Sequence, residues 1–286
     1  MNPPRTLGGL PQFQVYRAVS AALEEDLGPA GDLTTNSTVA EGTRAKGAIV
    51  ARAGGRIAGL QFAEASFKTF DHGALFEVEK GDGADIEPGQ AVAKMAGEAR
   101  ALLTGERVAL NFLGHLSGVA TLTRAFVRAV DDTQAKICCT RKTTPGMRTF
   151  EKYAVRMGGG VNHRFTLSDA ILIKDNHIAA SGGLDAAIKA AFANAGHTVK
   201  IEVEVDDLDQ LEAALRHPID AVLLDNMDPA TLARAVKLVN GRVTTEASGG
   251  ISLENVREAA ETGVDLISVG GLTHSAPALD VALDWS

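Results

Sequence analysis

The sequence is poor in aromatic residues and has no long apolar run. Aromatic residues make up 5% of the 286 positions, with one Trp and two Tyr. So sparse a set supplies no row of rings on which single-stranded nucleic acid would stack. No apolar run approaches the roughly 20 residues that cross a bilayer, and no signal peptide is recognisable. We therefore expect no nucleic-acid partner, no membrane partner and a cytoplasmic location.

Cysteine is also scarce, and the only two, Cys138 and Cys139, are adjacent in the chain. Neighbouring residues on a strand point to opposite faces, so we expect no disulfide between them. They also lack further ligands at the spacing that zinc sites use. Both cysteines are predicted to be packing residues.

The charge of the chain is acidic overall but unevenly distributed. The net charge is −8, yet residues 140–178 hold seven of the 28 Lys and Arg residues against only three acids. That stretch is therefore +4, which leaves −12 for the rest. A basic island of this kind favours a compact anion, whereas nucleic acid usually requires a broad basic face.

The second half of the sequence alternates short apolar strands with helices. Six strands are expected, at residues 136–139, 170–173, 200–205, 221–224, 244–247 and 266–269. Helices are expected after residue 145 and at 184–194, 208–216, 229–240 and 253–262. This alternation predicts a parallel α/β layout. An eight-stranded barrel needs more chain, so we expect an open, incomplete barrel.

The first half of the sequence has a different pattern. Residues 14–27 and 102–130 have helical spacing, whereas residues 45–90 form short alternating runs broken by glycine. That punctuation predicts a small, mainly antiparallel sheet. Asp26 lies at the end of the first expected helix and Asp32 in the turn after it. They could be metal ligands, but acids at such positions are more often solvated or capping.

Charged residues and glycines follow the expected strands of the second half at their C-terminal ends. In order, these residues are Arg141, Lys142, Lys174, Glu204, Asp225, Ser248, Gly249, Gly250, Gly270 and Gly271. In parallel barrels these ends carry the chemistry, and late glycine loops frequently bind phosphate. Alternation places Glu202 and Glu204 on one face, so periodicity does not choose between these two acids.

Three motifs make the chain recognisable: TRKTTPGMR, EKYAVRMGGGVNHR and LSDAILIKDNHI. They resemble the nicotinate-nucleotide pyrophosphorylase family, also called quinolinate phosphoribosyltransferase, and the resemblance covers most of the chain. It implies an N-terminal α/β sandwich domain over residues 1–115, with the tail 273–286 packed on it. It also implies an open α/β barrel, of the type II phosphoribosyltransferase kind, over residues 116–272.

The resemblance further implies a reaction and its residues. Quinolinate and phosphoribosyl pyrophosphate would give nicotinate mononucleotide, pyrophosphate and CO₂, for NAD biosynthesis, with Mg²⁺ as cofactor. The residues implied for quinolinate are Arg107, Arg141, His163, Arg164 and Lys174. Lys142 would lie between the substrates, and the late glycine loops would hold phosphate.

The family pattern EVEV selects Glu204 rather than Glu202, and Glu204 and Asp225 would face the ribose and Mg²⁺. Lys142, Lys174, Glu204 and Asp225 are the catalytic residues implied by the resemblance. The family also implies a homodimer in which Arg107 crosses the interface, with a higher oligomer left open.

Three other functions stay open from the sequence. A relative could use the same scaffold for another pyridine or in a molybdenum-linked role, although the intact RKT, NHR and IKDNH elements argue against this. Lys174 at its strand end also suits a Schiff-base lyase. A sugar-phosphate sensor without catalysis is the third alternative.

Overall fold

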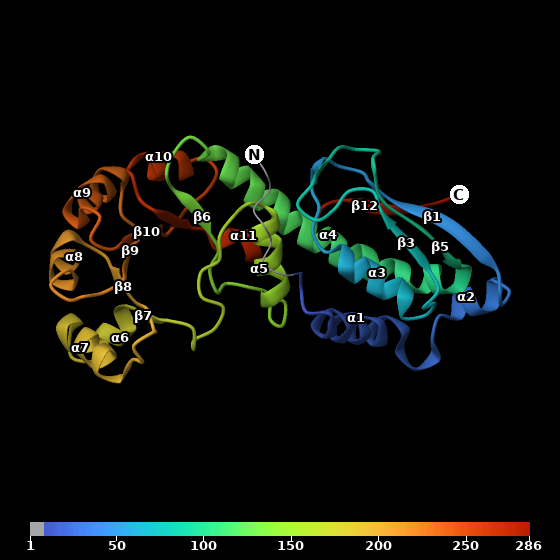
Figure 1. Cartoon of the computed structure of the whole chain (residues 1–286), viewed down its shortest axis with the longest axis horizontal. Helices are drawn as coiled ribbons and strands as arrows, with labels where there is room; N and C mark the ends of the chain where they lie inside the picture. Colours follow the sequence, from blue (N-terminus) through green and yellow to red (C-terminus); the bar gives the residue numbers. More distant parts are fainter. Residues whose placement is uncertain (1–8) are drawn as a thin grey trace. The chain divides into compact units, whose positions relative to one another are not determined.

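The computed structural model describes residues 9–286, and the chain forms two compact units. One unit comprises the chain up to Leu122 together with Ala276–Ser286, and the other comprises Thr123–Ser275. The first boundary falls inside α4 (Ala99–Ala129), a helix of 31 residues. Each unit contains a sheet and helices of its own (Figure 1).

The first unit is built on an antiparallel sheet with the strand order β12-β1-β5-β3. Its strands are β1 (Arg44–Ala51), β3 (Leu75–Val78), β5 (Ala91–Glu98) and β12 (Val281–Trp285), beside a separate pair, β2 (Gly55–Arg56) and β4 (Asp85–Ile86). The small antiparallel sheet predicted from the glycine-broken runs is therefore confirmed. The last strand, β12, pairs with β1 and so returns the end of the chain to this sheet.

Helices complete the first unit. Besides the first part of α4, they are α1 (Gln12–Leu27), the 3₁₀ turn η1 (Gly28–Ala30), α2 (Leu33–Thr38) and α3 (Leu60–Lys68). Helix α3 was not foreseen in the region predicted as sheet. Its Phe67 packs in the core with Ile49 of β1 and Leu102 and Leu113 of α4. Burial of these apolar side chains is the main force that holds helix to sheet.

Two glycines of α4 allow the C-terminal segment to lie directly against the helix. A β-carbon on Gly118 would lie 2.1 Å from the carbonyl oxygen of Pro277, and one on Gly114 would lie 3.0 Å from that of Leu279. The Leu279 N–H donates to the Gly114 carbonyl at 2.9 Å. The spacing of these two glycines therefore marks a close contact, and the helix continues through both positions without a break.

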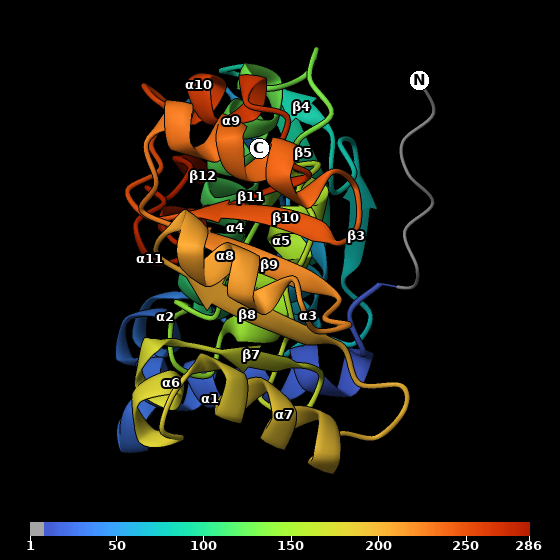
Figure 2. The same cartoon turned by 90° about the vertical axis from the view of Figure 1, so that its left-hand side faces the viewer.

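The second unit has a six-stranded parallel sheet with the order β6-β11-β10-β9-β8-β7. Its strands are β6 (Lys136–Cys138), β7 (Ile171–Ile173), β8 (Ile201–Val205), β9 (Ala221–Asp225), β10 (Thr244–Ser248) and β11 (Leu266–Ser268). All six lie where the sequence pattern predicted them. Figure 2 shows β7 to β11 following one another, with α7, α8 and α9 on the viewer's side of them.

The helices of the second unit follow the strands in turn. They are α5 (Arg148–Met157), α6 (Asp175–Ala180), α7 (Leu184–Asn194), α8 (Leu208–Ala214), α9 (Pro229–Val239), α10 (Val256–Glu261) and α11 (Gly271–His274). The last strand, β11, returns beside the first, β6. Within residues 9–286, no ladder joins β6 to β7, so the barrel stays open at that seam, as expected.

Three further expectations from the sequence can be compared with the structure. Cys138 and Cys139 are both free and buried, as predicted for packing residues. Asp32 caps α2, where its carboxylate accepts the Thr35 N–H at 2.9 Å, so capping is its observed role. In the part of the chain that the structure describes, no helix is both long enough and apolar enough to cross a membrane.

Candidate active site

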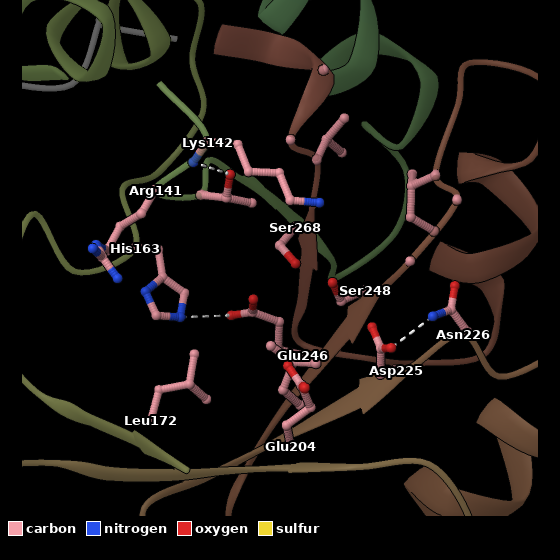
Figure 3. Close-up of a pocket in the computed structure, with 18 of the residues that line it drawn as sticks. Arg141, Lys142, His163, Leu172, Glu204, Asp225, Asn226, Glu246, Ser248 and Ser268 are labelled. Carbon is pink, nitrogen blue, oxygen red and sulfur yellow. Dashed lines mark hydrogen bonds and ion pairs between the residues drawn. The ribbon is translucent and has the colours of Figure 1, made fainter. Parts of the chain in front are cut away.

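A cavity of about 740 Å³ lies in the second unit, at the C-terminal ends of the parallel strands (Figure 3). Neighbouring parallel strands end at one edge of the sheet, which brings residues far apart in sequence into one place. The residues predicted for the site that line this cavity are Arg141, Lys142, His163, Arg164, Lys174, Glu204, Asp225, Ser248, Gly249, Gly250, Gly270 and Gly271.

Arg107 is the predicted residue that does not line this cavity. It lies on α4, in the portion that belongs to the first unit, and its side chain is exposed. Its predicted contribution across a dimer interface remains a prediction.

Two arginines of the cavity have buried donors without a protein partner. The Nε atoms of Arg141 and Arg164 are both buried and make no hydrogen bond to the described protein. Arg164 is positioned by its Nη1, which donates to the carbonyl of Ala170 at 2.7 Å. Burial, together with the like charge of Arg141, lowers the pKa of Arg164. Two adjacent guanidinium groups of this kind suit a carboxylate or phosphate ligand, which accepts paired N–H bonds.

His163 is held at three points. Its Nε2 lies 2.9 Å from Glu202 Oε2, its Nδ1 accepts the Arg164 N–H at 2.7 Å, and its carbonyl accepts from the buried ammonium of Lys152 at 2.9 Å. Burial lowers the pKa of His163, but the Glu202 hydrogen bond and the charges of Glu246 and Glu202 together raise it above its ordinary value.

The raised pKa favours a cationic ring, whereas the Arg164 N–H bond requires an unprotonated Nδ1. A cationic His163 would lose that bond, because both ring nitrogens would then be donors. We therefore assign the neutral tautomer, with its proton on Nε2 and donated to Glu202.

Lys174 and Glu204 form an ion pair inside the cavity. Lys174 directly follows β7 and is the N-cap residue of α6, where its N–H donates to His177 Nδ1 at 3.0 Å. The strand therefore delivers the ammonium group at the C-terminal edge of the sheet, as its sequence position predicted.

The structure separates the two acids that periodicity left equivalent. Glu204 lines the cavity. Glu202, two residues earlier on β8, is hydrogen-bonded to His163 and is not among the lining residues. Asp225 ends the next strand, β9, and its Oδ2 accepts from the amide of Asn226 at 2.6 Å. Two carboxylates at neighbouring strand ends thus share the cavity with the cationic groups.

The late glycine loops present free backbone donors. Within residues 9–286, the N–H groups of Gly249, Gly250, Gly270 and Gly271 make no hydrogen bond. Gly249 and Gly250 both have positive φ, at 95° and 60°. These loops therefore offer backbone donors of the type that bind phosphate oxygens.

Several lining residues were missed from the sequence: Thr140, Asn226, Glu246, Ser268 and His274. Glu246 lies in the middle of β10 in a buried run, where an acid is unusual. It is two residues before Ser248, so alternation alone would have placed both on one face. That pattern was the available signal.

Comparison with known proteins agrees with this geometry. The family models for the N-terminal and C-terminal domains of quinolinate phosphoribosyl transferase match residues 32–117 and 119–284. A Bacillus subtilis (strain 168) protein named as a probable nicotinate-nucleotide pyrophosphorylase [carboxylating] is 48% identical over 272 residues, covering 95% of this chain and 93% of the relative. The nicotinate-nucleotide pyrophosphorylase [carboxylating] of Mycobacterium leprae (strain TN) is 46% identical, covering 96% and 98%.

A solved structure shows the same fold. The crystal structure of NadC from Streptococcus pyogenes superposes with a TM-score of 0.94 at 42% identity, covering 98% of this chain and 99% of that one. The two matched domain models together account for nearly the whole chain, from residue 32 to residue 284. With matching sequence, matching fold and a cationic cavity at the strand ends, the chain belongs to the quinolinate phosphoribosyl transferase family.

Proposed function

We propose that this protein transfers the phosphoribosyl group of phosphoribosyl pyrophosphate to quinolinate. The products are nicotinate mononucleotide, pyrophosphate and CO₂, in the de novo synthesis of NAD. The observation that carries this proposal is the pair of buried, unpartnered Nε donors of Arg141 and Arg164 in one cavity. A dicarboxylate is the ligand that such paired guanidinium donors match best.

Quinolinate is assigned to the cationic side of the cavity. Arg141, Arg164 and Lys174 supply positive charge. The His163 ring, held in one orientation by its hydrogen bond to Glu202, forms part of the cavity wall. Removing a buried cation that pairs with a substrate carboxylate costs about 2–5 kcal/mol of binding free energy, because the carboxylate is then buried without a partner. Removing one of them is therefore expected to weaken quinolinate binding by more than tenfold.

Phosphoribosyl pyrophosphate is assigned to the side formed by the later strands. The Glu204 and Asp225 carboxylates suit hydrogen bonds from the ribose hydroxyls, and the free N–H groups of the Gly249–Gly250 and Gly270–Gly271 loops suit phosphate oxygens. Lys142 follows Arg141 at the end of β6 and lies in the same cavity. We assign it to the pyrophosphate or phosphoribosyl side, between the two substrates.

Mg²⁺ fits the donor set at this end of the cavity. The candidate ligands are Glu204 and Asp225, whose carboxylates line the cavity from neighbouring strands. Mg²⁺ prefers carboxylate oxygens and keeps positions for water and substrate phosphates. When bound, it would neutralise negative charge on the pyrophosphate leaving group.

The reaction needs no covalent enzyme intermediate. The pyridine nitrogen attacks C1 of the phosphoribosyl group, and pyrophosphate leaves with its bonding electrons. Carboxylates of the Glu204 and Asp225 pair stabilise the positive character that develops on C1. The quaternised ring then loses its 2-carboxylate as CO₂. The residues act mainly by holding the two substrates in line and by electrostatic stabilisation.

We also propose that the working form is a homodimer in which Arg107 of each subunit completes the partner's quinolinate site. The exposure of Arg107 on α4 is compatible with this role. A higher oligomer built from such dimers is compatible with the same arrangement.

The test is one incubation with quinolinate, phosphoribosyl pyrophosphate and Mg²⁺, in which nicotinate mononucleotide and CO₂ are followed together. Equimolar formation of both is the expected result. A ribotide formed from another pyridine, with no product from quinolinate, would keep the fold and overturn the substrate assignment. Tight phosphoribosyl pyrophosphate binding with no turnover of any pyridine would favour a sensor.

A further inference from the structure

Glu246 is a buried acid that the substrate assignments above do not use. It lies on β10, its residue is 2% exposed, and it lines the cavity. In Figure 3 its carboxyl group points toward His163, on the side assigned to quinolinate. Burying a carboxyl group is costly unless it is paired or neutral, so this position calls for an explanation.

The hydrogen bonds around His163 leave Glu246 without a donor from the imidazole ring. The single ring proton on Nε2 is given to Glu202, whose Oε2 lies at 2.9 Å. Glu246 Oε2 lies 3.8 Å from the same nitrogen, beyond hydrogen-bond distance. Its other oxygen, Oε1, is buried and has no partner in the part of the chain that the structure describes. Two carboxyl groups thus face one imidazole, and only Glu202 receives its proton.

The surrounding charges favour a protonated Glu246. Burial raises the pKa of its carboxyl group to about 7, and the negative charge of Glu202 acts in the same direction. His163, the Ser268 hydroxyl and Lys174 oppose this shift in part. Cys138, the other titratable neighbour, has its own pKa raised by burial and by Glu246. Near neutral pH a large fraction of Glu246 therefore carries a proton.

The other groups near the ring are less suited to give up a proton. The Nε2 proton of His163 is engaged by Glu202, and the Lys174 ammonium is paired with Glu204. The two arginines hold their protons throughout the accessible pH range. Glu246 combines a raised pKa, a place in the cavity wall and a buried Oε1 that has no partner in the part of the chain that the structure describes.

We propose that Glu246 is the general acid that protonates the pyridine carbon from which CO₂ departs. This inference rests on the proposed function. The bond between ring carbon 2 and its carboxylate breaks, CO₂ leaves, and the bonding electron pair stays on carbon 2 beside the cationic ring nitrogen. That pair takes the proton of Glu246 and forms the C–H bond of nicotinate mononucleotide. Glu246 is left as a carboxylate and regains a proton from water.

A metal site is the rival use of the same residues. Ligand atoms of His163, Glu202 and Glu246 all lie within 4.8 Å of one another. However, His163 has no free ligand atom, because its Nε2 carries the proton donated to Glu202 and its Nδ1 accepts the Arg164 N–H. Proton transfer therefore agrees better with the geometry than metal binding does.

The test compares the wild-type enzyme with Glu246→Gln, which keeps the size of the side chain and removes its carboxylic proton. Dissociation constants for quinolinate and phosphoribosyl pyrophosphate are expected to stay within about threefold, while kcat falls about 100-fold, the usual worth of a general acid. In the wild type, kcat is expected to fall as pH rises above neutrality. In the variant this fall is absent, and a single turnover releases more pyrophosphate than CO₂.

Glu246→Asp is the second variant, because it keeps an acid and remains informative where the glutamine variant folds poorly. It is expected to retain the alkaline fall in kcat at a reduced rate. Unchanged kcat in Glu246→Gln would overturn the proposal, as would lost quinolinate affinity at normal kcat, which would mean that Glu246 only positions His163. Tight Zn²⁺ binding that Glu246→Gln abolishes would also overturn it.

The two proposals fail in distinguishable ways. If the wild-type enzyme forms no nicotinate mononucleotide, the proposed function itself fails. If the wild type forms product and CO₂ in equal amounts and Glu246→Gln behaves like it, only the role of Glu246 fails.

Discussion

The side chain of Asn226 packs against the backbone of Gly249 so closely that no β-carbon fits at position 249. A β-carbon on Gly249 would lie 2.1 Å from Asn226 Oδ1 and 2.9 Å from the Asn226 backbone nitrogen. Asn226 itself has positive φ, 53°, and its N–H donates to the Ser248 carbonyl at 2.8 Å. Because the Asn226 amide also bonds Asp225, this contact links the glycine loop after β10 to the carboxylate at the end of β9.

Gly249→Ala is therefore expected to lower the free energy of unfolding by about 3 kcal/mol, from positive φ combined with the clash. It should also weaken phosphoribosyl pyrophosphate binding, because displacing Asn226 disturbs Asp225. Urea unfolding and calorimetric titration measure the two effects. The matched control is Gly250→Ala, which has positive φ but nothing within 4 Å of its β-carbon, with an expected cost of about 1 kcal/mol. Equal losses in both variants would show that Asn226 moves aside freely.

The site residues found from the strand pattern share one property, which explains why they were found, whereas the roles of Arg107, His163 and Arg164 came from the family resemblance. Lys174 and Asp225, for example, come directly after or at the end of a short apolar strand, and parallel strands deliver such positions to one edge. Glu246 lies inside its strand, and alternation places it on the same face as Ser248. Its approach to His163 depends in addition on sheet register and burial, which the sequence pattern does not encode. Helix α3 was missed for a related reason, since its Phe67 faces a core formed by distant segments.

Arg141→Ala is expected to weaken quinolinate binding by about 2–5 kcal/mol. The buried Nε of Arg141 has no acceptor in the described protein, so it is free to bind a substrate carboxylate, which the variant would leave unpaired. Phosphoribosyl pyrophosphate binding should change by less than about threefold, or 0.7 kcal/mol. Titration calorimetry with each substrate alone measures both. Arg234→Ala, exposed on α9, is the control and should leave both affinities unchanged. Equal losses for the two substrates would contradict the assignment of Arg141 to quinolinate.

Mixing two inactive variants tests the shared dimer site. Arg107→Ala and Lys174→Ala are each expected to be inactive as homodimers. In a random 1:1 mixture, half of the dimers are mixed, and one of their two sites has both residues intact. Activity should therefore recover to about one quarter of the wild-type value, by the symmetry of a two-fold dimer. No recovery in mixtures shown by mass spectrometry to contain heterodimers would mean that Arg107 serves its own subunit or neither.

Glu246 also predicts how stability depends on pH. Its pKa is raised from 4.5 to about 7 in the folded protein, so between these values the folded state binds more protons than the unfolded state. Stability from this group is then fully present below pH 4.5 and is lost as pH rises through about 7. The loss amounts to about 3 kcal/mol at 1.4 kcal/mol for each pKa unit.

Glu246→Gln cannot titrate, so its stability relative to wild type is expected to increase by up to about 3 kcal/mol between pH 4.5 and pH 8. Urea unfolding at several pH values measures this difference. Glu212→Gln, exposed on α8, is the control and should run parallel to wild type. If Glu246→Gln also runs parallel, Glu246 ionises like an ordinary carboxyl group. It would then have no proton to give near neutral pH, and its role as the acid in decarboxylation would be lost with it.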